Sequence, residues 1–452
     1  MPVRAFGYAG GKPLPFSGPV EITNAAPEYA QALLRAIQAH GGETRIVPRV
    51  SGQSLAILTE GLSSLSTSER HYAVLEALLA RADGAPTIVL DLAKGELQNL
   101  GGCAGLCRSF RIERPQARVF SFSFEACPDL SVASERVVLG LGEPLDDYIL
   151  REDGGWREAP GGGLVPPTGA VVVDYPPVWL VTGGARGVTA DCAIELARRT
   201  GGTFVLLGRS SLAAWPDWLE PQSDIKALRG LLARNSSRAD MPKRPVEIDR
   251  LARRLMASAE ISSTISAIEA AGAKALYIQA DIGHAAEAQR VIAAVQQSEG
   301  SITGLVHGAG VLSDGRVETL QLQDFDKVFA PKVEGFETVL SCLATNRLRH
   351  VAVFSSASAV FGNEGQANYA AANSWLNNVA EQLSVSLPNA QVKAFCWGPW
   401  QGGMVDDALA RMFTERGIGL ISRSEGARIF ADQLLLSPRE QVRFVIGDEW
   451  GV

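Results

Sequence analysis

The sequence predicts an α/β protein whose two halves each contain a parallel β-sheet covered by helices. Short apolar runs alternate with amphipathic helical runs along most of the 452 residues, a pattern typical of strands joined by helical crossovers. A stretch rich in Gly and Pro over residues 159–177, APGGGLVPPTGAVVVDYPP, interrupts that alternation, as linkers do. We therefore expect two Rossmann-like subdomains, a truncated one over residues 1–170 and a doubly wound one over residues 171–452.

The front part carries apolar runs that predict buried strands and amphipathic runs that predict helices. The first strand, VEIT, leads into AAPEYA without a glycine turn where a phosphate could meet a helix N-terminus. We expect a Rossmann-like shape without a nucleotide site. The expected strands are residues 20–23, 44–50, 54–58, 87–92 and 119–124, and the expected helices are residues 28–40 and 71–82.

The back part shows seven strand candidates separated by helical runs such as 190–200, 286–297 and 372–384. This order predicts a doubly wound sheet with its chemistry at the carboxyl ends of the strands. The candidates are residues 178–184, 204–209, 275–281, 304–310, 351–358, 392–398 and 443–447.

A long segment between the second and third of these strands, residues 211–271, exceeds an ordinary connection and predicts inserted helices. The segment is locally basic, which suits either a solvated helical face or a surface that docks an acidic partner. Its cations are Lys226, Arg229, Arg234, Arg238, Lys243, Arg244, Arg250, Arg253 and Arg254.

Composition excludes several classes of function. A formal net charge of −7 gives no general attraction to nucleic acid or an anionic membrane, and no apolar run is long enough to predict a membrane span. We expect a cytosolic protein with reduced thiols. Only Cys103 and Cys107 lie close together, without the partners of a zinc site, so we expect no metal. The cysteines are Cys103, Cys107, Cys127, Cys192, Cys342 and Cys396.

A glycine-rich turn after the first strand of the back part, VWLVTGGARGVTA, is a candidate pyrophosphate site. Thr182, Gly183, Gly184 and Gly187 lie where glycines let a phosphate approach the unpaired N–H groups of a helix. An ordinary turn between a strand and a helix is the alternative, because such a motif alone is weak.

The second strand ends in Gly208, Arg209 and Ser210, without an acid to bind a ribose 2′-hydroxyl. Arg209 is placed to meet a 2′-phosphate, which favours NADPH over NADH, although it could also be a simple surface cation. Asp281 ends the third strand, where its carboxylate could bind the adenine amino group or cap a helix.

The fourth strand ends in HGAG, where Gly308, Ala309 and Gly310 would let a cofactor lie against the backbone. We expect His307, which precedes them, to be structural rather than catalytic.

Four polar side chains match the needs of ketone reduction by a nicotinamide. Hydride arriving at a carbonyl carbon leaves negative charge on oxygen, which an acid and a fixed donor must stabilise. Tyr369 is the candidate acid and Ser356 the candidate donor, and Asn373 lies four residues after the tyrosine, on the same helix face. Lys332, in APKVEGF, is the candidate ammonium.

At these residues the chain resembles the short-chain dehydrogenase/reductase superfamily, with one informative departure. Most members carry lysine four residues after the tyrosine, whereas this chain has Asn373 there and Lys332 upstream. That exchange resembles ketoreductase domains of modular polyketide synthases, as do PKVEG, FSSASAVFGNEGQANYAAAN and WGPWQGGM. The front part is similar to the family's non-binding structural subdomain through GLCRSFRIERPQARVFSF.

The resemblance implies roles for these residues. Lys332 would bind the cofactor ribose and lower the pKa of Tyr369, Ser356 and Tyr369 would hold the ketone oxygen, and Asn373 would anchor a proton-relay water. It also implies that the cofactor touches further residues, which complete the expected contact set Thr182, Gly183, Gly184, Arg186, Gly187, Val188, Arg209, Ser210, Asp281, Ile282, Gly308, Ala309, Gly310, Lys332 and Tyr369.

The glycine turn departs from the family pattern because Arg186 and Thr189 replace glycines. Arg186 could bind phosphate or point to solvent. This variant turn, with the long insert, looks most like ketoreductases of polyunsaturated-fatty-acid and enediyne-type synthases.

Stereochemical markers are read by position in the same family. The family's LDD string, typical of D-hydroxy products, corresponds to Leu312, Ser313 and Asp314, so only its last aspartate is kept. Phe361 takes the place of the tryptophan of L-producers, and Ala371 that of the proline of epimerising D-producers. Asp314 and Phe361 are thus the candidate substrate-orienting residues, and we expect a D-3-hydroxy product without epimerisation.

The resemblance implies NADPH-dependent reduction of a 3-ketoacyl thioester held on the phosphopantetheine arm of an acyl carrier protein, beside other domains of a polyketide synthase. We expect the excised domain to be monomeric, with a substrate lid around residues 405–417. A free-standing reductase of ketones or acyl-CoA, and a domain kept only for architecture or epimerisation, are the alternatives.

Overall fold

The computed structural model describes most of both halves of the chain. The predicted boundary at residue 170, the turn after the first strand and part of the predicted lid lie outside the described residues. The described residues are 19–23, 27–48, 54–59, 65–81, 84–91, 101–124, 129–141, 147–151, 154–157, 176–222, 224–238, 241–402, 407–415 and 417–447.

The front half forms a sheet of seven described strands in the order β2-β1-β3-β4-β5-β6-β7. Its neighbouring strands are parallel except β6 and β7, which form an antiparallel pair at one edge. Apolar side chains of the strands and of α1 and α4 form its core. The bounds are β1 Val20–Thr23, β2 Thr44–Ile46, β3 Ala56–Thr59, β4 Thr87–Asp91, β5 Val119–Phe124, β6 Tyr148–Arg151 and β7 Gly154–Arg157.

Four helices accompany this sheet. The sequence predicted α1 and α2 but missed α3, α4 and the β6–β7 pair, because their apolar residues are interrupted by small and charged ones. α3, in particular, buries Arg108 and Ser109 along with its apolar residues. The bounds are α1 Pro27–Ala39, α2 Thr67–Leu79, α3 Cys103–Glu113 and α4 Leu130–Leu141.

The back half forms a fully parallel sheet of seven described strands in the order β10-β9-β8-β11-β12-β13-β14. All seven predicted strands are confirmed. The order reverses between β8 and β11, so a crevice opens there at the carboxyl ends of the strands. The bounds are β8 Val178–Thr182, β9 Thr203–Gly208, β10 Lys274–Gln279, β11 Gly304–His307, β12 His350–Ser356, β13 Gln391–Trp397 and β14 Arg443–Ile446.

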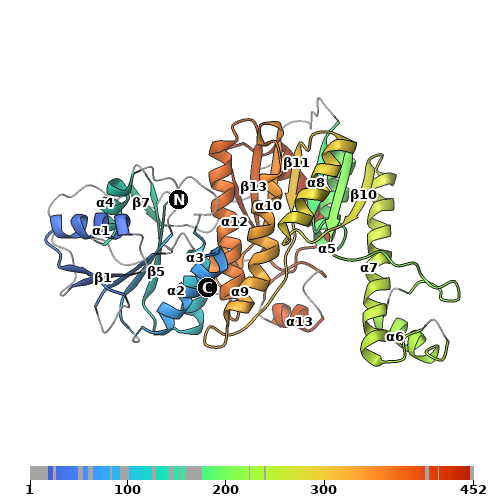
Figure 1. Cartoon of the computed structure of the whole chain (residues 1–452), viewed down its shortest axis with the longest axis horizontal. Coiled ribbons are helices and arrows are strands. Elements are labelled where there is room, and N and C mark those ends of the chain that lie inside the picture. Colours follow the sequence, from blue (N-terminus) through green and yellow to red (C-terminus); the bar gives the residue numbers. More distant parts are fainter. Residues whose placement is uncertain are drawn as a thin grey trace.

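Helices cover both faces of the back sheet, and the two halves lie side by side in an elongated molecule (Figure 1). The bounds are α5 Gly187–Thr200, α6 Ile225–Arg234, α7 Pro245–Ala270, α8 Ala285–Glu299, α9 Leu322–Phe329, the π-helical turn η2 Ala330–Glu334, α10 Gly335–Ser341, the 3-10 turn η3 Thr345–Arg347, α11 Ser358–Phe361, α12 Ala367–Ser386, α13 Asp407–Glu415 and α14 Arg423–Leu436.

The inserted segment folds into a helical arm, which we define as α6 and α7. The C-terminal part of α7 is the crossover into β10, and its N-terminal part extends beyond the sheet with α6 beside it (Figure 1). The arm has its own small core, formed by Leu228 and Leu232 of α6 against Ile248 and Leu255 of α7. The predicted inserted helices are therefore present, and one of them doubles as a crossover.

The two halves are joined mainly by α3 of the front half and α12 of the back half. Gly105 packs so closely on α12 that a Cβ atom there would collide with the carbonyl oxygen of Ala370. The Gly105 amide also donates a hydrogen bond of 3.0 Å to Ser374 Oγ. Because α12 carries Tyr369 and Asn373, the front half directly supports the helix of the predicted catalytic residues.

Candidate active site

A cavity of about 1350 Å³ opens at the carboxyl ends of the strands of the back sheet. The predicted residues Thr182, Gly183, Arg186, Gly187, Val188, Arg209, Ser210, Asp281, Ile282, Gly308, Ala309, Gly310, Asp314, Lys332, Ser356 and Tyr369 all line it. Gly184 and Asn373 lie behind this lining, buried beneath it. Residues far apart in the sequence thus share one cavity, as the position of the topological switch requires.

The glycine turn forms one wall of the cavity. Gly183 has φ of +69°, and a Cβ atom there would lie 3.0 Å from the backbone of Ala309, so the turn and the HGAG segment pack backbone against backbone. Helix α5 then begins without a side-chain cap at Arg186, which leaves its first N–H groups directed outward. The arrangement is suited to hold a pyrophosphate.

One of these amides already has a protein partner. The N–H of Gly187 donates a hydrogen bond of 2.9 Å to Glu260 Oε1, from α7 of the helical arm. A carboxylate is an anion, and it sits where the turn would receive phosphate oxygens. Sequence reasoning missed Glu260, because it lies in the inserted segment far from any motif.

At the far end of the cavity, Arg209 and Asp281 lie at the ends of β9 and β10. Arg209 Nη1 is 4.0 Å from Asp281 Oδ2, and the arginine side chain is 61% exposed. Asp281 Oδ1 accepts the N–H of Gly283 at 3.0 Å, whereas the N-cap position of α8 is held by His284. Asp281 therefore closes a local turn and is not the cap of that helix.

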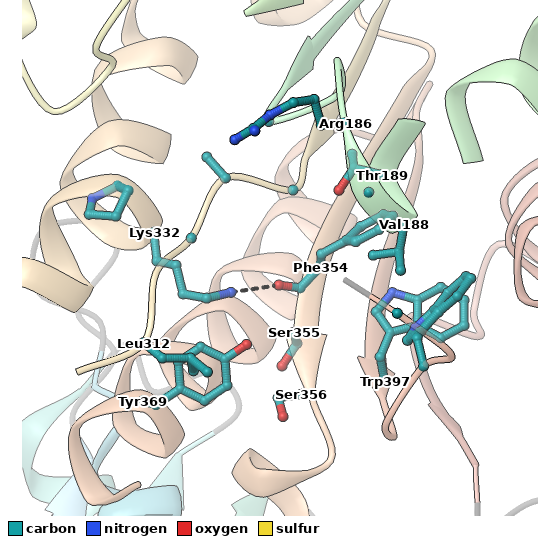
Figure 2. Close-up of a pocket in the computed structure, with 18 of the residues that line it drawn as sticks. Arg186, Val188, Thr189, Leu312, Lys332, Phe354, Ser355, Ser356, Tyr369 and Trp397 are labelled. Carbon is teal, nitrogen blue, oxygen red and sulfur yellow. Dashed lines mark hydrogen bonds between the residues drawn. The ribbon is translucent and has the colours of Figure 1, made fainter. Parts of the chain in front are cut away.

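Arg186 is exposed and lines the cavity beside the start of α5 (Figure 2). Burial raises the pKa of the Tyr277 phenol, and the positive charge of Arg186 opposes part of that rise. Tyr277 in turn donates a hydrogen bond of 2.6 Å to the carbonyl of Ser210. Arg186 and Arg209 are thus two cations that line the cavity.

The catalytic candidates converge around Lys332. Its Nζ donates to Asn373 Oδ1 at 2.9 Å and to the carbonyl of Phe354 at 3.0 Å, and it lies 5.2 Å from the centre of the Tyr369 ring. Asn373 Nδ2 donates to the Tyr369 carbonyl at 2.8 Å. Figure 2 shows the phenol of Tyr369 pointing toward the strand that carries Ser355 and Ser356.

Burial controls the protonation of this cluster. It raises the pKa of Tyr369 to about 12, with a smaller opposing effect from Asn373, and it lowers the pKa of Lys332 to about 7. The lowering of the Tyr369 pKa by Lys332, which the resemblance implies, stays a prediction. Burial disfavours the charged phenolate more than the hydrogen bond with Asn373 favours it.

Ser356 lies at the end of β12, next to the short helix α11. Its Oγ accepts hydrogen bonds from the Ser358 N–H at 3.1 Å and from the Ser358 hydroxyl at 3.0 Å. Since both bonds use the oxygen as an acceptor, the Ser356 hydroxyl hydrogen stays available to donate. The neighbouring Ser355 also lines the cavity and donates to the Asn373 carbonyl at 3.1 Å.

His307 is buried and joins two elements of the site. Its Nε2 donates to the Lys332 carbonyl at 3.0 Å, and its Nδ1 accepts from the Thr182 hydroxyl at 2.9 Å. Burial lowers its pKa to about 3, so the ring is neutral and uses both nitrogens structurally. These contacts support the structural interpretation of His307.

The two stereochemical markers are placed differently. Asp314 lines the cavity and accepts a hydrogen bond of 3.1 Å from Gln366 Nε2, and burial raises its pKa. Phe361 ends α11, and among the described residues that line the cavity its neighbours Gly362 and Asn363 appear but Phe361 does not. The role predicted for Phe361 in orienting the substrate therefore stays a prediction.

The helix that follows β13, α13, forms an apolar part of the cavity lining. Helix α13 contributes Leu409, Met412 and Phe413 to the lining, and Trp397 and Trp400 line the same cavity. This helix lies within the predicted lid, although residues 403–406 and 416 are outside the described part of the chain. The tryptophans were missed as site residues, since apolar aromatic positions in a strand look like core.

We also considered whether the described residues contain a metal site or a helix that could cross a membrane. Cys103 and Cys107 are buried on α3 as reduced thiols, and Cys127 lies outside the described residues. Within the described ranges, no group of three or more His, Cys, Asp or Glu side chains is arranged as a metal site. No described helix combines the length and apolar character needed to cross a membrane.

The doubly wound sheet, the glycine turn and the lysine–asparagine–tyrosine cluster together define a nicotinamide-dependent reductase of ketones. The model of one protein family, the KR domain, matches residues 177–402. The chain belongs to this family, and it is a ketoreductase domain of the polyketide-synthase type.

Similar proteins agree with this assignment. The chain is 34% identical over 354 residues to a component of the polyunsaturated fatty acid synthase of Thraustochytrium, covering 75% of this chain and 12% of that protein. It is 30% identical over 261 residues to a component of the phenolphthiocerol/phthiocerol polyketide synthase of Mycobacterium tuberculosis, covering 57% and 10%. The chain thus spans about a tenth of the length of these curated relatives.

Solved structures share the fold of both halves. An A-type ketoreductase from a modular polyketide synthase superposes with a TM-score of 0.69 at 19% identity, covering 99% of this chain and 91% of that one. A ketoreductase from the first module of phoslactomycin biosynthesis in Streptomyces gives 0.67 at 19% identity, with coverage of 98% and 92%. The predicted two-sheet fold is confirmed.

Proposed function

We propose that this chain uses NADPH to reduce a 3-ketoacyl thioester, carried on the phosphopantetheine arm of an acyl carrier protein, to the 3-hydroxyacyl thioester. The observation that carries the proposal is the meeting of Lys332, Asn373, Tyr369 and Ser356 at one cavity. The same cavity contains the start of α5, where the N-cap residue makes no capping bond of its own, and such a helix N-terminus suits a pyrophosphate.

The residues at the end of β9, together with Arg186, fit NADPH better than NADH. Arg209 and Arg186 both line the cavity, and guanidinium is well matched to a phosphate. β9 ends in glycine without the acid that would accept bonds from a free ribose 2′-hydroxyl. Lys332 would reach the nicotinamide ribose, while Gly183 and Gly187 would face the pyrophosphate.

When bound, the cofactor supplies the hydride that reduces the carbonyl carbon. Tyr369 keeps its proton at neutral pH because burial holds its pKa near 12, so it is in the correct state to protonate the developing alkoxide. Ser356 has a free hydroxyl hydrogen to donate to the same oxygen. Lys332, in contact with Asn373, stabilises the phenolate that remains after the proton has moved.

We extend the proposal to the product and the partner. Asp314, held by Gln366 on the substrate side of the cavity, supports a D-3-hydroxy product without epimerisation. The exposed cations of the helical arm support docking of an acidic carrier protein, since Arg250 and Arg254 extend into solvent.

The test is turnover of NADPH with a 3-ketoacyl N-acetylcysteamine thioester and with the same acyl group on a carrier protein. We expect NADPH consumption with both, a lower KM for the carrier-bound form, and the D isomer on chiral analysis. Absence of turnover with both substrates overturns the reductase proposal. A preference for NADH overturns the cofactor, and a mainly L product overturns the stereochemical part.

A further inference from the structure

Glu113 is the last residue of α3, in the front half, yet its carboxylate binds two segments of the back half. Its side chain is 0% exposed. Oε2 accepts the N–H of Val317 at 2.9 Å, and Oε1 accepts the N–H of Gly365 at 2.9 Å. One buried carboxylate thus accepts backbone hydrogen bonds from two loops that are far apart in the sequence.

Both loops form the substrate side of the cavity. The first, residues 312–317, contributes Leu312 and Asp314 to the lining, and the second, residues 362–366, contributes Gly362, Asn363 and Gln366. We call them together the substrate wall.

The two loops are also joined to each other. The Gly315 N–H donates to the Gly365 carbonyl at 2.9 Å, and Gln366 Nε2 donates to Asp314 at 3.1 Å. The second loop leads directly into α12, where Tyr369 follows within one turn. A shift of this loop would therefore move Asp314, Gln366 and the start of the catalytic helix together.

Helix α3 holds the second loop and the residues before it at two further points. Arg108 Nη1 donates to the Ala359 carbonyl at 2.9 Å, and Ser109 Oγ accepts the Asn363 N–H at 3.1 Å. Ser109 is completely buried. The face of α3 that bears Arg108, Ser109 and Glu113 therefore follows this stretch of chain along its length.

Glu113 differs from Arg108 and Ser109 because its carboxylate binds both loops of the substrate wall at once. A buried N–H group that loses its acceptor has no water to replace it, so the loss is costly. Arg316, 3.8 Å from Glu113 Oε2, compensates part of the carboxylate's charge from the solvent side. At Val317 and Gly365, the front half supplies the acceptor that the loop amides need.

We propose that Glu113 is a positioning residue for the ketone. It fixes the substrate wall through the amides of Val317 and Gly365 and does not touch the reacting atoms. The front half, which contributes none of the four catalytic candidates, would then influence how the ketone is oriented and which face receives hydride. This inference rests on the reductase function proposed above.

The test compares Glu113→Gln with Glu318→Gln in the full chain. Glutamine keeps the size of the side chain but replaces one acceptor oxygen with an NH₂ group, which leaves either Val317 or Gly365 unpaired. Glu318 is a matched control because it also bridges the two halves, through Arg114 at 3.3 Å, but is exposed. Ser109→Ala, which removes one bond to the second loop, is a milder second variant.

For Glu113→Gln we expect about a tenfold loss in kcat/KM for the 3-ketoacyl thioester, the size that one unpaired buried group implies. The ratio of D to L product should fall, while the dissociation constant of NADPH stays unchanged. Glu318→Gln should behave as wild type, and Ser109→Ala should lie between the two.

Amide hydrogen exchange provides a readout that does not need turnover. We expect faster exchange in Glu113→Gln confined to residues 312–317 and 359–366. If the wild type reduces no ketone, the proposed function fails but the exchange result still decides whether Glu113 holds the wall. Equal behaviour of Glu113→Gln and Glu318→Gln, or faster exchange spread over both sheets, overturns the inference.

Discussion

Lys332 Nζ lies 2.9 Å from Asn373 Oδ1, across 41 residues of sequence. The lysine sits in a π-helical turn and the asparagine on the face of α12 that also carries Tyr369. This pair places an amine beside the phenol without a lysine on α12 itself. The relationship explains how the departure from the common tyrosine–lysine spacing can leave the site intact.

Tyr369→Phe removes the proposed acid and little else. We expect kcat to fall by about 100-fold or more, in the range found for loss of a general acid, because the phenol is the proposed source of the proton that the alkoxide takes up. NADPH binding, measured by fluorescence titration, should remain. Undiminished turnover would exclude Tyr369 as the proton donor.

Lys332→Met tests the depressed pKa of the lysine through stability. The folded-state pKa is about 7, against an ordinary value of 10.5, so between these pH values the unfolded chain binds more protons and wild-type stability rises with pH. Below pH 7 both states are protonated and the cost of the buried ammonium is fully present.

The stability of Lys332→Met relative to wild type should therefore be most favourable near pH 6 and become less so toward pH 9. Urea unfolding of both proteins at each pH measures the difference. A difference that does not change with pH would show that Lys332 titrates as an ordinary lysine.

Glu260→Gln tests the carboxylate at the phosphate turn. Because Glu260 accepts the Gly187 amide at 2.9 Å, it competes for the position expected for the pyrophosphate and repels that anion. We expect the dissociation constant of NADPH to fall by a few-fold, consistent with removing one unfavourable charge near a surface. Glu269→Gln, an exposed change on the same helix, is the control.

Calorimetric titration of the two variants gives the comparison. Weaker NADPH binding in Glu260→Gln would mean that the carboxylate assists the cofactor instead of competing with it.

Arg209→Ala tests the choice between the two nicotinamide cofactors. Loss of a charged donor to a phosphate should raise the KM for NADPH by about tenfold or more, with little effect on NADH. Steady-state kinetics with both cofactors measures the ratio. Arg186→Ala in the same assay tests whether Arg186 binds the phosphate or points to solvent. If it binds the phosphate, the variant should lose part of its preference for NADPH, and if it points to solvent, the preference should not change.

Reversal of Arg250, Arg253 and Arg254 to glutamate tests the helical arm. Arg253 pairs with Asp249 at 2.8 Å, while Arg250 and Arg254 are exposed. We expect a higher KM for the carrier-bound thioester and an unchanged KM for the free thioester, because rim charges act on association.

Arg290→Glu on α8, an exposed charge reversal away from the arm, is the control for a reversal at another surface. An equal effect of the arm variant on both substrates would show that the arm is not a docking surface.

The back sheet, the glycine turn and the identity of the polar set could all be predicted from the residues alone. Strands of a parallel sheet are continuous apolar runs, and Tyr369 and Asn373 share a helix face through spacing alone. The location of the site followed from the order of the strands.

Only the tertiary structure revealed the raised pKa of Tyr369, the contact of Glu260 with Gly187, and the hydrogen bonds of Glu113 to two distant loops. These depend on burial and on long-range packing, which no local pattern records. In the sequence, Glu113 cannot be told apart from an acid on the protein surface. Packing of α3 against α12 buries its carboxylate, and the buried oxygens then need hydrogen-bond donors, which the Val317 and Gly365 amides of the back half supply.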